Sequence, residues 1–378
     1  MAITIGSGIT FGGGISILPD YGPTGYQLWT WGSNTAGALG LGDTLSRSSP
    51  VQVGALTDWL TISNSGVYGR DRSLAIKLDG TLWAWGSNYT GILGLSTTID
   101  KSSPVQVGAL TTWLSTSAGG YATAGIKTDG TLWTWGGNNF GVLGLNGGPY
   151  LSSPVQVGSL TWSIISMFET TACAAAIRTT GSLWAWGYNA SGQLGQNNTI
   201  NQSSPVQVGA LTNWSTIATY NNQIISIKTD GTLWGWGQNN KGQLGLNTAY
   251  LSYSSPKQVG ALTSWATISC SRMSSYGIKT DGTLWSWGSS NYGQLGLGTT
   301  IYRSSPTQVG SLTTWLAIAG GQYSATAIKT DGTLWTWGAG GLGFGDIIDR
   351  SSPVQIGALT NWHSVTGRGY EVLALKPA

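Results

Sequence analysis

A unit of about 51 residues recurs along the chain, and this repetition constrains the fold more strongly than any local propensity does. Each unit carries a Leu-Trp-x-Trp-Gly segment, a Ser-Ser-Pro and a third tryptophan. Seven units account for all 21 tryptophans, at Trp29/Trp31/Trp59, Trp83/Trp85/Trp113, Trp133/Trp135/Trp162, Trp184/Trp186/Trp214, Trp234/Trp236/Trp265, Trp285/Trp287/Trp315 and Trp335/Trp337/Trp362. A period near 50 residues is typical of β-propeller blades, and rings repeated in this way are expected to pack between adjacent sheets.

One unit illustrates the predicted strands. Residues Ala124 to Gly136 alternate with period two on both sides of Asp129-Gly130, a pair that favours the tight turn of a β-hairpin. A Gly-rich loop follows, as at Asn239 to Gly245, and then two further short strands around Pro-Val-Gln-Val-Gly and Trp-x-x-Ile-Ser. A basic residue ends the first hairpin strand in every unit, and it is expected to pack or pair locally rather than bind a ligand.

The two ends of the chain complete each other. The first Leu28 to Gly32 segment lacks the strand that precedes it in other units, whereas Val372 to Lys376 matches that strand and then stops. The sequence therefore predicts an all-β, seven-bladed β-propeller over residues 21–378, closed by the C-terminal strand joining the first blade. Residues 1–20 are predicted to form an extended N-terminal arm outside the ring.

Composition narrows the possible functions. Only 8% of residues are charged, with 17 Lys+Arg against 14 Asp+Glu and a single His, which argues against acid/base catalysis and against a nucleic-acid surface. We find no catalytic triad, phosphate loop or metal motif, and expect no catalytic residues, metal or cofactor. No apolar run is long enough for a membrane helix, and the N-terminus lacks the features of a secretory signal. Cys173 and Cys270 are too few for a disulfide framework, and their redox state stays open.

The predicted arm alternates apolar and small residues in a six-residue repeat. Its apolar positions are Ile3, Ile5, Ile9, Phe11, Ile15 and Ile17. The segment is either a flexible leader or a strand-like arm that docks on another subunit by edge addition. The second interpretation is favoured, because six large apolar side chains outside the ring would otherwise stay in water.

The segments before each Ile-Lys strand vary most between units, and equivalent loops in a ring lie on one face. That face would gather Tyr and Arg, the residues that most often anchor recognition. The candidate binding residues are Arg70, Arg72, Tyr121, Phe168, Tyr220, Arg272, Tyr323, Arg368 and Tyr370. A second variable set, including Leu45 to Arg47 and Gly147 to Leu151, gives another candidate surface. The alternative is that these loops merely tolerate change.

A run of the form Asp-Gly-Thr-Leu-Trp-x-Trp-Gly-x-Asn-x-x-Gly-Gln-Leu-Gly occurs at Asp230 to Gly245 and, closely, at Asp281 to Gly296. It resembles the repeat of the regulator of chromosome condensation family, and the resemblance covers about residues 21–378. The resemblance implies a seven-bladed propeller closed by a shared blade, and it implies activity only weakly. The founding member is a nucleotide exchange factor that contacts chromatin, but a net charge of +3 and the lack of a basic tail do not fit that role.

The uniform repeats look more like prokaryotic or viral members of the family, and the Gly/Ile-rich leader looks similar to arms of bacteriophage structural proteins. The sequence therefore predicts a non-enzymatic structural or binding module, displayed on a virion through its arm and contacting other subunits or a host surface protein. The alternatives are a bacterial protein-interaction propeller and a glycan-binding, lectin-like propeller. No nucleic-acid partner and no membrane insertion are expected.

Overall fold

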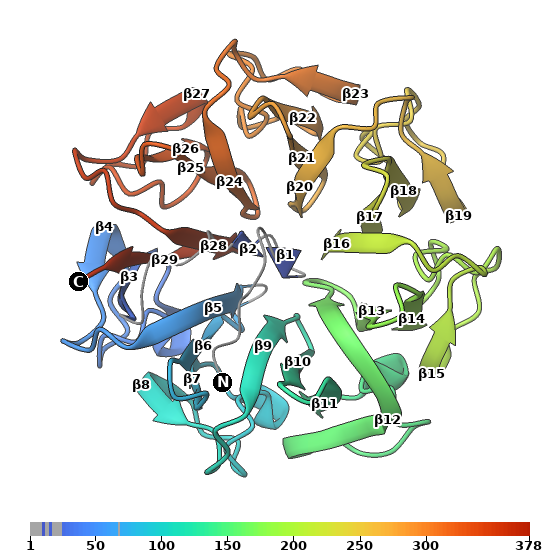
Figure 1. Cartoon of the computed structure of the whole chain (residues 1–378). Helices are drawn as coiled ribbons and strands as arrows, with labels where there is room; N and C mark the ends of the chain where they lie inside the picture. Colours follow the sequence, from blue (N-terminus) through green and yellow to red (C-terminus); the bar gives the residue numbers. More distant parts are fainter. Residues whose placement is uncertain (1–9, 12–14, 17–24, 67–68) are drawn as a thin grey trace.

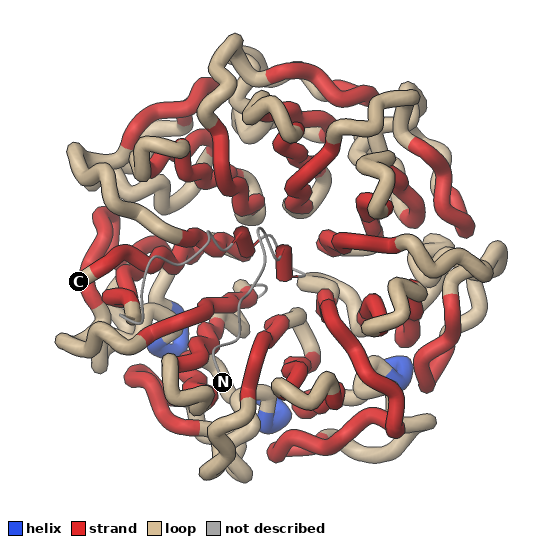
Figure 2. Tube along the Cα trace, viewed as in Figure 1, coloured by secondary structure: helices blue, strands red, loops and turns tan. Residues whose placement is uncertain are grey.

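The computed structural model describes residues 10–11, 15–16, 25–66 and 69–378. The described residues form seven four-stranded antiparallel blades arranged around a central axis, which confirms the predicted propeller (Figure 1). The first strand of each blade lies nearest the axis and the fourth lies at the rim. Apart from three single helical turns, Thr35–Gly37, Tyr89–Gly91 and Asn139–Gly141, the described chain consists of strands and loops (Figure 2).

The strands follow the repeat closely, so each blade contains the same four elements from axis to rim. Blade 1 consists of β28 (Ser364–Arg368), β29 (Glu371–Pro377), β3 (Tyr26–Gly32) and β4 (Arg47–Gln52). Blade 2 consists of β5 (Trp59–Ser65), β6 (Arg72–Lys77), β7 (Leu82–Gly86) and β8 (Lys101–Gln106). Blade 3 consists of β9 (Trp113–Ala118), β10 (Ala122–Lys127), β11 (Thr131–Gly136) and the first part of β12 (Leu151–Met167). Blades 4 and 5 consist of the rest of β12, β13 (Cys173–Arg178), β14 (Leu183–Gly187) and β15 (Gln202–Gln207); and β16 (Trp214–Tyr220), β17 (Gln223–Lys228), β18 (Leu233–Gly237) and β19 (Tyr253–Gln258). Blades 6 and 7 consist of β20 (Trp265–Cys270), β21 (Ser274–Lys279), β22 (Leu284–Gly288) and β23 (Arg303–Gln308); and β24 (Trp315–Gly320), β25 (Ser324–Lys329), β26 (Leu334–Gly338) and β27 (Arg350–Gln355).

Blade 1 closes the ring as the two chain ends predict. Strand β29 pairs with β28 on one side, where Leu373 lies opposite Thr366, and with β3 on the other, where Ala374 lies opposite Trp29. Leu373, Ala374 and Leu375 are completely buried. A strand from the C-terminus therefore fills the position between two elements that are more than 300 residues apart in sequence.

The hydrophobic core lies between neighbouring blades rather than inside them. The second tryptophan of each pair is completely buried, and in five blades its indole N–H donates to a loop carbonyl of the preceding blade, as from Trp85 to Ala38 at 2.8 Å. Gly40 has a φ of +75°, and a Cβ there would lie 2.7 Å from the Trp85 indole nitrogen, so this approach requires glycine.

The repeated lysines pack against tryptophan faces, in agreement with the structural role that the sequence favours. The Lys127 Nζ lies 3.5 Å from the centroid of the Trp133 ring and 5.3 Å from that of Trp113, and four other repeats show the same nesting. Lys77 also pairs with Asp58 at 3.2 Å. These cations hold the Trp cluster of their own blade, which leaves no ring of free lysines for a ligand.

Two pieces of the predicted arm are described, and they lie at the ring axis. Strands β1 (Thr10–Phe11) and β2 (Ile15–Ser16) pair antiparallel, with Phe11 opposite Ile15. In Figure 1 this pair sits in the centre of the ring, where β1 lies against β12 and β16 and β2 lies against β24 and β28. Here the structure differs from an arm that extends away from the propeller. Ile3, Ile5, Ile9 and Ile17 lie outside the described residues.

Candidate binding face

Two sets of loops emerge on the same face of the ring because the strands of each blade are antiparallel. One set joins the first and second strands, at residues 69–71, 119–121, 168–172, 221–222, 271–273, 321–323 and 369–370. The other set follows the third strand. The two sets are tied together within each blade by backbone hydrogen bonds, such as Gly137 N–H to the Tyr121 carbonyl at 2.8 Å. We call this surface the loop face, and the Asp-Gly turns lie on the opposite face.

The structure divides the nine predicted binding residues into two groups. Tyr370 is exposed, and Arg70, Tyr121, Arg272 and Tyr323 are half-buried with part of each side chain on the loop face. The other four are buried and do not belong to the binding surface, which corrects the prediction from sequence; these are Arg72, Phe168, Tyr220 and Arg368. The two arginines turn inward to backbone carbonyls, and the two aromatic residues pack in the cores between blades.

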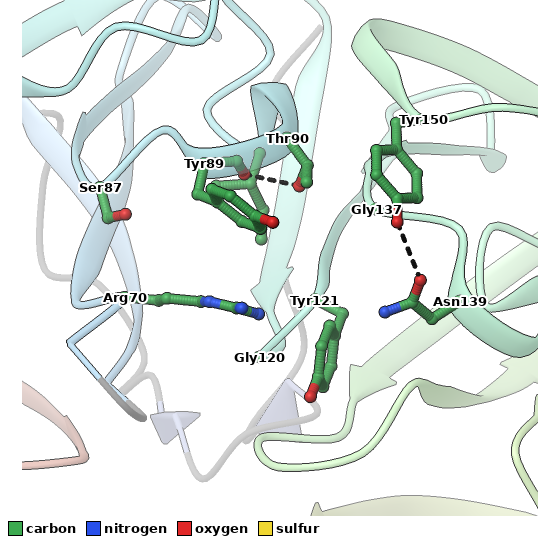
Figure 3. Close-up of a pocket in the computed structure, with 10 residues that line it drawn as sticks. Arg70, Ser87, Tyr89, Thr90, Gly120, Tyr121, Gly137, Asn139 and Tyr150 are labelled. Atoms are coloured by element: carbon green, nitrogen blue, oxygen red, sulfur yellow. Dashed lines mark hydrogen bonds between the residues drawn. The ribbon is translucent and has the colours of Figure 1, made fainter.

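The first pocket on the loop face lies between blades 2 and 3 (Figure 3). The Arg70 guanidinium carbon lies 4.7 Å from the centroid of the Tyr89 ring and 5.2 Å from that of Tyr121. Across the pocket, the Tyr150 hydroxyl donates a 3.2 Å hydrogen bond to Asn139. Among the described residues the Arg70 side chain makes no hydrogen bond or ion pair, so its N–H groups remain available to a ligand.

A second group of the same kind lies at blades 6, 7 and 1. The Arg272 guanidinium donates a hydrogen bond to the Tyr323 hydroxyl and lies 5.5 Å from the centroid of that ring. The Tyr323 ring lies 4.7 Å from Tyr292 and 6.1 Å from Tyr370, measured between centroids. Partial desolvation by the surrounding side chains, together with neighbouring Tyr323, raises the pKa of the Tyr370 hydroxyl above its usual value, so this exposed residue is a neutral donor at physiological pH.

Sequence reasoning missed two members of these groups, Tyr89 and Tyr292. Both lie in the Gly-rich loop after the third strand, which recurs along the chain. The only available signal was an aromatic residue in this loop, where other units carry Asn139 or Asn240 at the position of Tyr89 and Ser191 or Lys241 at that of Tyr292.

Beneath the loop face, a buried cluster of charged residues crosses the axis. The Arg368 guanidinium from blade 1 pairs with Glu169 of blade 4 at 3.2 Å and donates to the Met167 and Thr219 carbonyls at 3.0 and 3.3 Å. Glu169 in turn accepts hydrogen bonds from the Ser65 hydroxyl and the Gly66 N–H of blade 2. Both side chains are at most 4% exposed. This axial cluster connects blades across the ring, and its groups are committed to structural bonds.

Arg72 has a similar role at the edge of the axial cluster. Its guanidinium donates to the Gly119 and Ala122 carbonyls of the next blade. Burial lowers the pKa of Arg72 to about 10, while nearby Glu169 and Glu371 oppose that shift. Arg72 therefore remains charged at neutral pH and joins blade 2 to blade 3.

Glu371 is the exception, because its buried carboxyl oxygens accept no hydrogen bond of normal geometry from the described residues. Burial and the nearby Asp71 raise the pKa of Glu371 well above its ordinary value of 4.5. The folded chain therefore holds this proton to higher pH than the unfolded chain does. As the pH rises above about 4.5, the unfolded state loses the proton first and the free energy of unfolding falls.

We expect Glu371→Gln to raise the free energy of unfolding at pH 8, where the unfolded chain has lost the Glu371 proton, and to have little effect below pH 4.5. Urea unfolding at both pH values measures this difference. Asp129→Asn is the matched control: hydrogen bonds from Thr131 lower the pKa of Asp129, so that substitution should change stability in the opposite direction. An equal effect of Glu371→Gln at both pH values would contradict the assignment.

The residues that commonly hold metals are dispersed over the described part of the chain, where no group of three or more His, Cys, Asp or Glu side chains could ligate an ion. Cys173 and Cys270 are buried free thiols in blades 4 and 6, and burial raises the pKa of Cys270 to about 11. Within the described ranges there is also no helix with the length and apolarity needed to cross a membrane.

Comparison with known proteins agrees with this architecture. A model described as RCC1-like domain matches residues 109–376, and a model of the regulator of chromosome condensation (RCC1) repeat matches residues 27–65 and 79–126. Among solved structures, Prp20p of Saccharomyces cerevisiae is 18% identical with a TM-score of 0.82 over 93% of this chain and 92% of that one. Human WBSCR16 is 19% identical with a TM-score of 0.81, over 93% and 99%. At these identities the structures show the fold alone.

The curated relatives share shorter stretches. Human "Probable E3 ubiquitin-protein ligase HERC3" is 39% identical over 87 residues, 23% of this chain and 8% of that protein, and human RCC2 is 37% identical over 82 residues, 21% and 15%. The ultraviolet-B receptor UVR8 of Arabidopsis thaliana is 28% identical over 193 residues, 48% and 42%. The matched stretches thus span less than half of each relative. Since the domain model extends over well more than half of the sequence, the chain belongs to the RCC1-like domain family.

Proposed function

We propose that this chain is a non-enzymatic binding module that holds a protein partner on its loop face. The observation that carries the proposal is the pocket around Arg70, where a guanidinium with unused N–H groups is held between two tyrosine rings. Tyr and Arg are the residues that most often dominate binding energy at protein interfaces, and here they converge on one face of a rigid ring.

The family supports protein binding as the general role. Solved structures of the yeast relative concern its binding to Gsp1p and histones and its complex with Kap60. The loop residues of this chain, and not those of the yeast relative, determine which partner it binds. The ligase activity in the name of HERC3 is not part of the proposal, because the matched stretch covers only 8% of that protein.

The proposal includes a setting for the module. We infer that the N-terminal segment, through Ile3, Ile5, Ile9 and Ile17, which flank the Phe11/Ile15 hairpin in sequence, anchors the propeller in a larger assembly such as a bacteriophage particle, where the loop face contacts a neighbouring subunit or a host surface protein. The alternation of apolar and small residues in this segment supports strand addition to another subunit.

A glycan is the second candidate ligand. Tyr89 and Tyr150 are each more than half exposed and surround the pocket together with Tyr121. Aromatic faces beside amide and guanidinium donors suit a sugar ring as well as a protein side chain. A glycan array on which binding disappears with Tyr121→Ala would favour this candidate over a protein partner.

The test of the proposed function is site-specific photocross-linking in the native assembly. A benzophenone amino acid in place of Tyr121 is expected to trap a discrete protein adduct, whereas the same group in place of Asp129, which is exposed on the opposite face, should not. A chain that lacks residues 1–20, tested in the same experiment, is expected not to be incorporated into the assembly. Equal adducts from positions 121 and 129 would argue against a loop-face partner, and unchanged incorporation would argue against the anchor.

A further inference from the structure

The two arginine–tyrosine groups occupy the same repeat positions. Arg70 and Arg272 each lie seven residues before the basic residue that ends the second strand of their blade, Lys77 and Lys279. Tyr121 and Tyr323 each lie six residues before the equivalent lysine of the next blade. The Tyr121 and Tyr323 carbonyls accept equivalent hydrogen bonds at 2.8 and 2.9 Å. The same arginine–tyrosine pair is therefore present at two junctions, that of blades 2 and 3 and that of blades 6 and 7.

Other junctions of the ring carry different residues at these positions. The corresponding pairs are Gly369/Asp71, Gly120/Ala172, Thr171/Asn222, Asn221/Met273 and Gln322/Tyr370. The tryptophans, by contrast, recur in all seven blades. Because the scaffold is uniform and the arginine–tyrosine pair appears at two junctions out of seven, the repeated fold itself does not require the pair.

The chemistry of each pocket favours a carboxylate. A guanidinium presents a planar fork of N–H donors that matches a carboxylate, and stacking on tyrosine rings holds the fork in place before a ligand arrives. The loop after the third strand of the same blade adds one more ring to each pocket. Tyr89 lies against Arg70, whereas Tyr292, one position later in its repeat, lies against Tyr323. Each pocket holds one arginine, whose single charge balances that of a carboxylate but not the charge of about −2 that a phosphate monoester carries at pH 7.

The two junctions lie on opposite sides of the ring axis, near β6 and β10 and near β21 and β25 (Figure 1). We propose that the loop face binds an acidic segment of its protein partner bivalently, with one Asp or Glu carboxylate on Arg70 and another on Arg272. This inference rests on the proposed function and specifies the chemistry of the partner. Once one carboxylate is bound, the second binds at a high effective concentration, so the affinity depends on both pockets.

Calorimetric titration with poly-glutamate chains tests the inference. A chain of about 30 residues can extend to about 100 Å, whereas one of five residues extends to about 17 Å. We expect the long chain to bind at least ~10-fold more tightly than the short one. Arg70→Ala and Arg272→Ala should each bring the long chain close to the affinity of the short one, and Arg70→Lys should lose nearly as much because an ammonium lacks the planar fork.

Arg303→Ala is the matched control, since it removes the same charge from the first residue of β23, at the loop-face end of that strand, without touching either pocket. A loss equal to that of Arg70→Ala would show nonspecific charge attraction and overturn the inference, as would equal affinities of long and short chains. Near-ultraviolet circular dichroism of each variant verifies the fold. Stronger competition by inorganic phosphate than by acetate would overturn the assignment to carboxylates.

The two proposals fail in different ways. A cross-linked partner at position 121, together with no binding of poly-glutamate, would leave the binding module intact and reject the carboxylate chemistry. Absence of any loop-face adduct would reject the proposed function, whatever the titrations show.

Discussion

A chain that ends after Tyr370 should fail to form the closed monomeric ring. The truncation removes β29, whose Leu373 and Leu375 are completely buried and whose backbone pairs with both β28 and β3. It leaves two unpaired strand edges and an exposed apolar core in blade 1, a loss comparable to the entire ~5–15 kcal/mol by which domains are usually stable. Size-exclusion chromatography and thermal unfolding followed by circular dichroism measure the outcome.

A circular permutant provides the control. Pro377 lies opposite Tyr26 in the β29–β3 pair. A permuted chain can therefore begin with residues 364–378 and continue through a short linker into Gly25. We expect this chain to recover the cooperative unfolding transition of the intact protein. A truncated chain that stays monomeric with an unchanged midpoint would contradict the role given to β29.

Glu169→Gln should destabilise the protein by about 3–5 kcal/mol, because it leaves the Arg368 charge buried without its partner. The substitution keeps the size of the side chain, so the effect reports the lost ion pair rather than a cavity. Urea unfolding at pH 7 gives the change in the free energy of unfolding. In the double variant with Arg368→Met the loss should be smaller than the sum of the two single losses, since the uncompensated charge is gone.

The surface ion pair between Arg350 and Asp346 supplies the comparison. Its atoms are 2.8 Å apart, closer than those of the axial pair, but its side chains are 19% and 35% exposed. Asp346→Asn should therefore lower the free energy of unfolding far less than Glu169→Gln does. If Asp346→Asn cost as much as Glu169→Gln, burial would not be the reason that the axial pair matters.

The sequence was informative wherever a property repeats. Patterns that occur several times predict the period, the strand order, the closure by Val372 to Lys376 and the packing of the tryptophans. A fold assignment must agree with every copy of the repeat, and this requirement makes the prediction reliable. The direction of a side chain in a turn has no such periodicity. Arg70 in the loop and Arg72 at the start of β6 are two residues apart, yet Arg72 points to buried carbonyls and Arg70 lies at the surface.

The axial cluster could not be predicted for a related reason. Arg368 and Glu169 are 199 residues apart, and their contact depends on how the ring brings blades 1 and 4 together. The position of β1 and β2 could not be predicted for the same reason. The sequence is consistent with a flexible leader or a docking arm, and nothing in it indicates that these residues lie at the axis of their own ring.

The contacts between neighbouring blades and the hydrogen bonds across the axis depend differently on the number of blades. A tryptophan that donates to the loop of the blade before it would fit a ring of six or eight blades equally well, because it involves neighbours only. Arg368, by contrast, reaches the carbonyls of Ala118, Met167 and Thr219, on the inner strands of blades 3, 4 and 5, and these distances hold only at the diameter of this ring. A duplicated or deleted repeat would preserve the contacts between neighbouring blades but would break the hydrogen bonds across the axis. The non-repeating residues at the axis therefore favour a ring of seven blades over any other number.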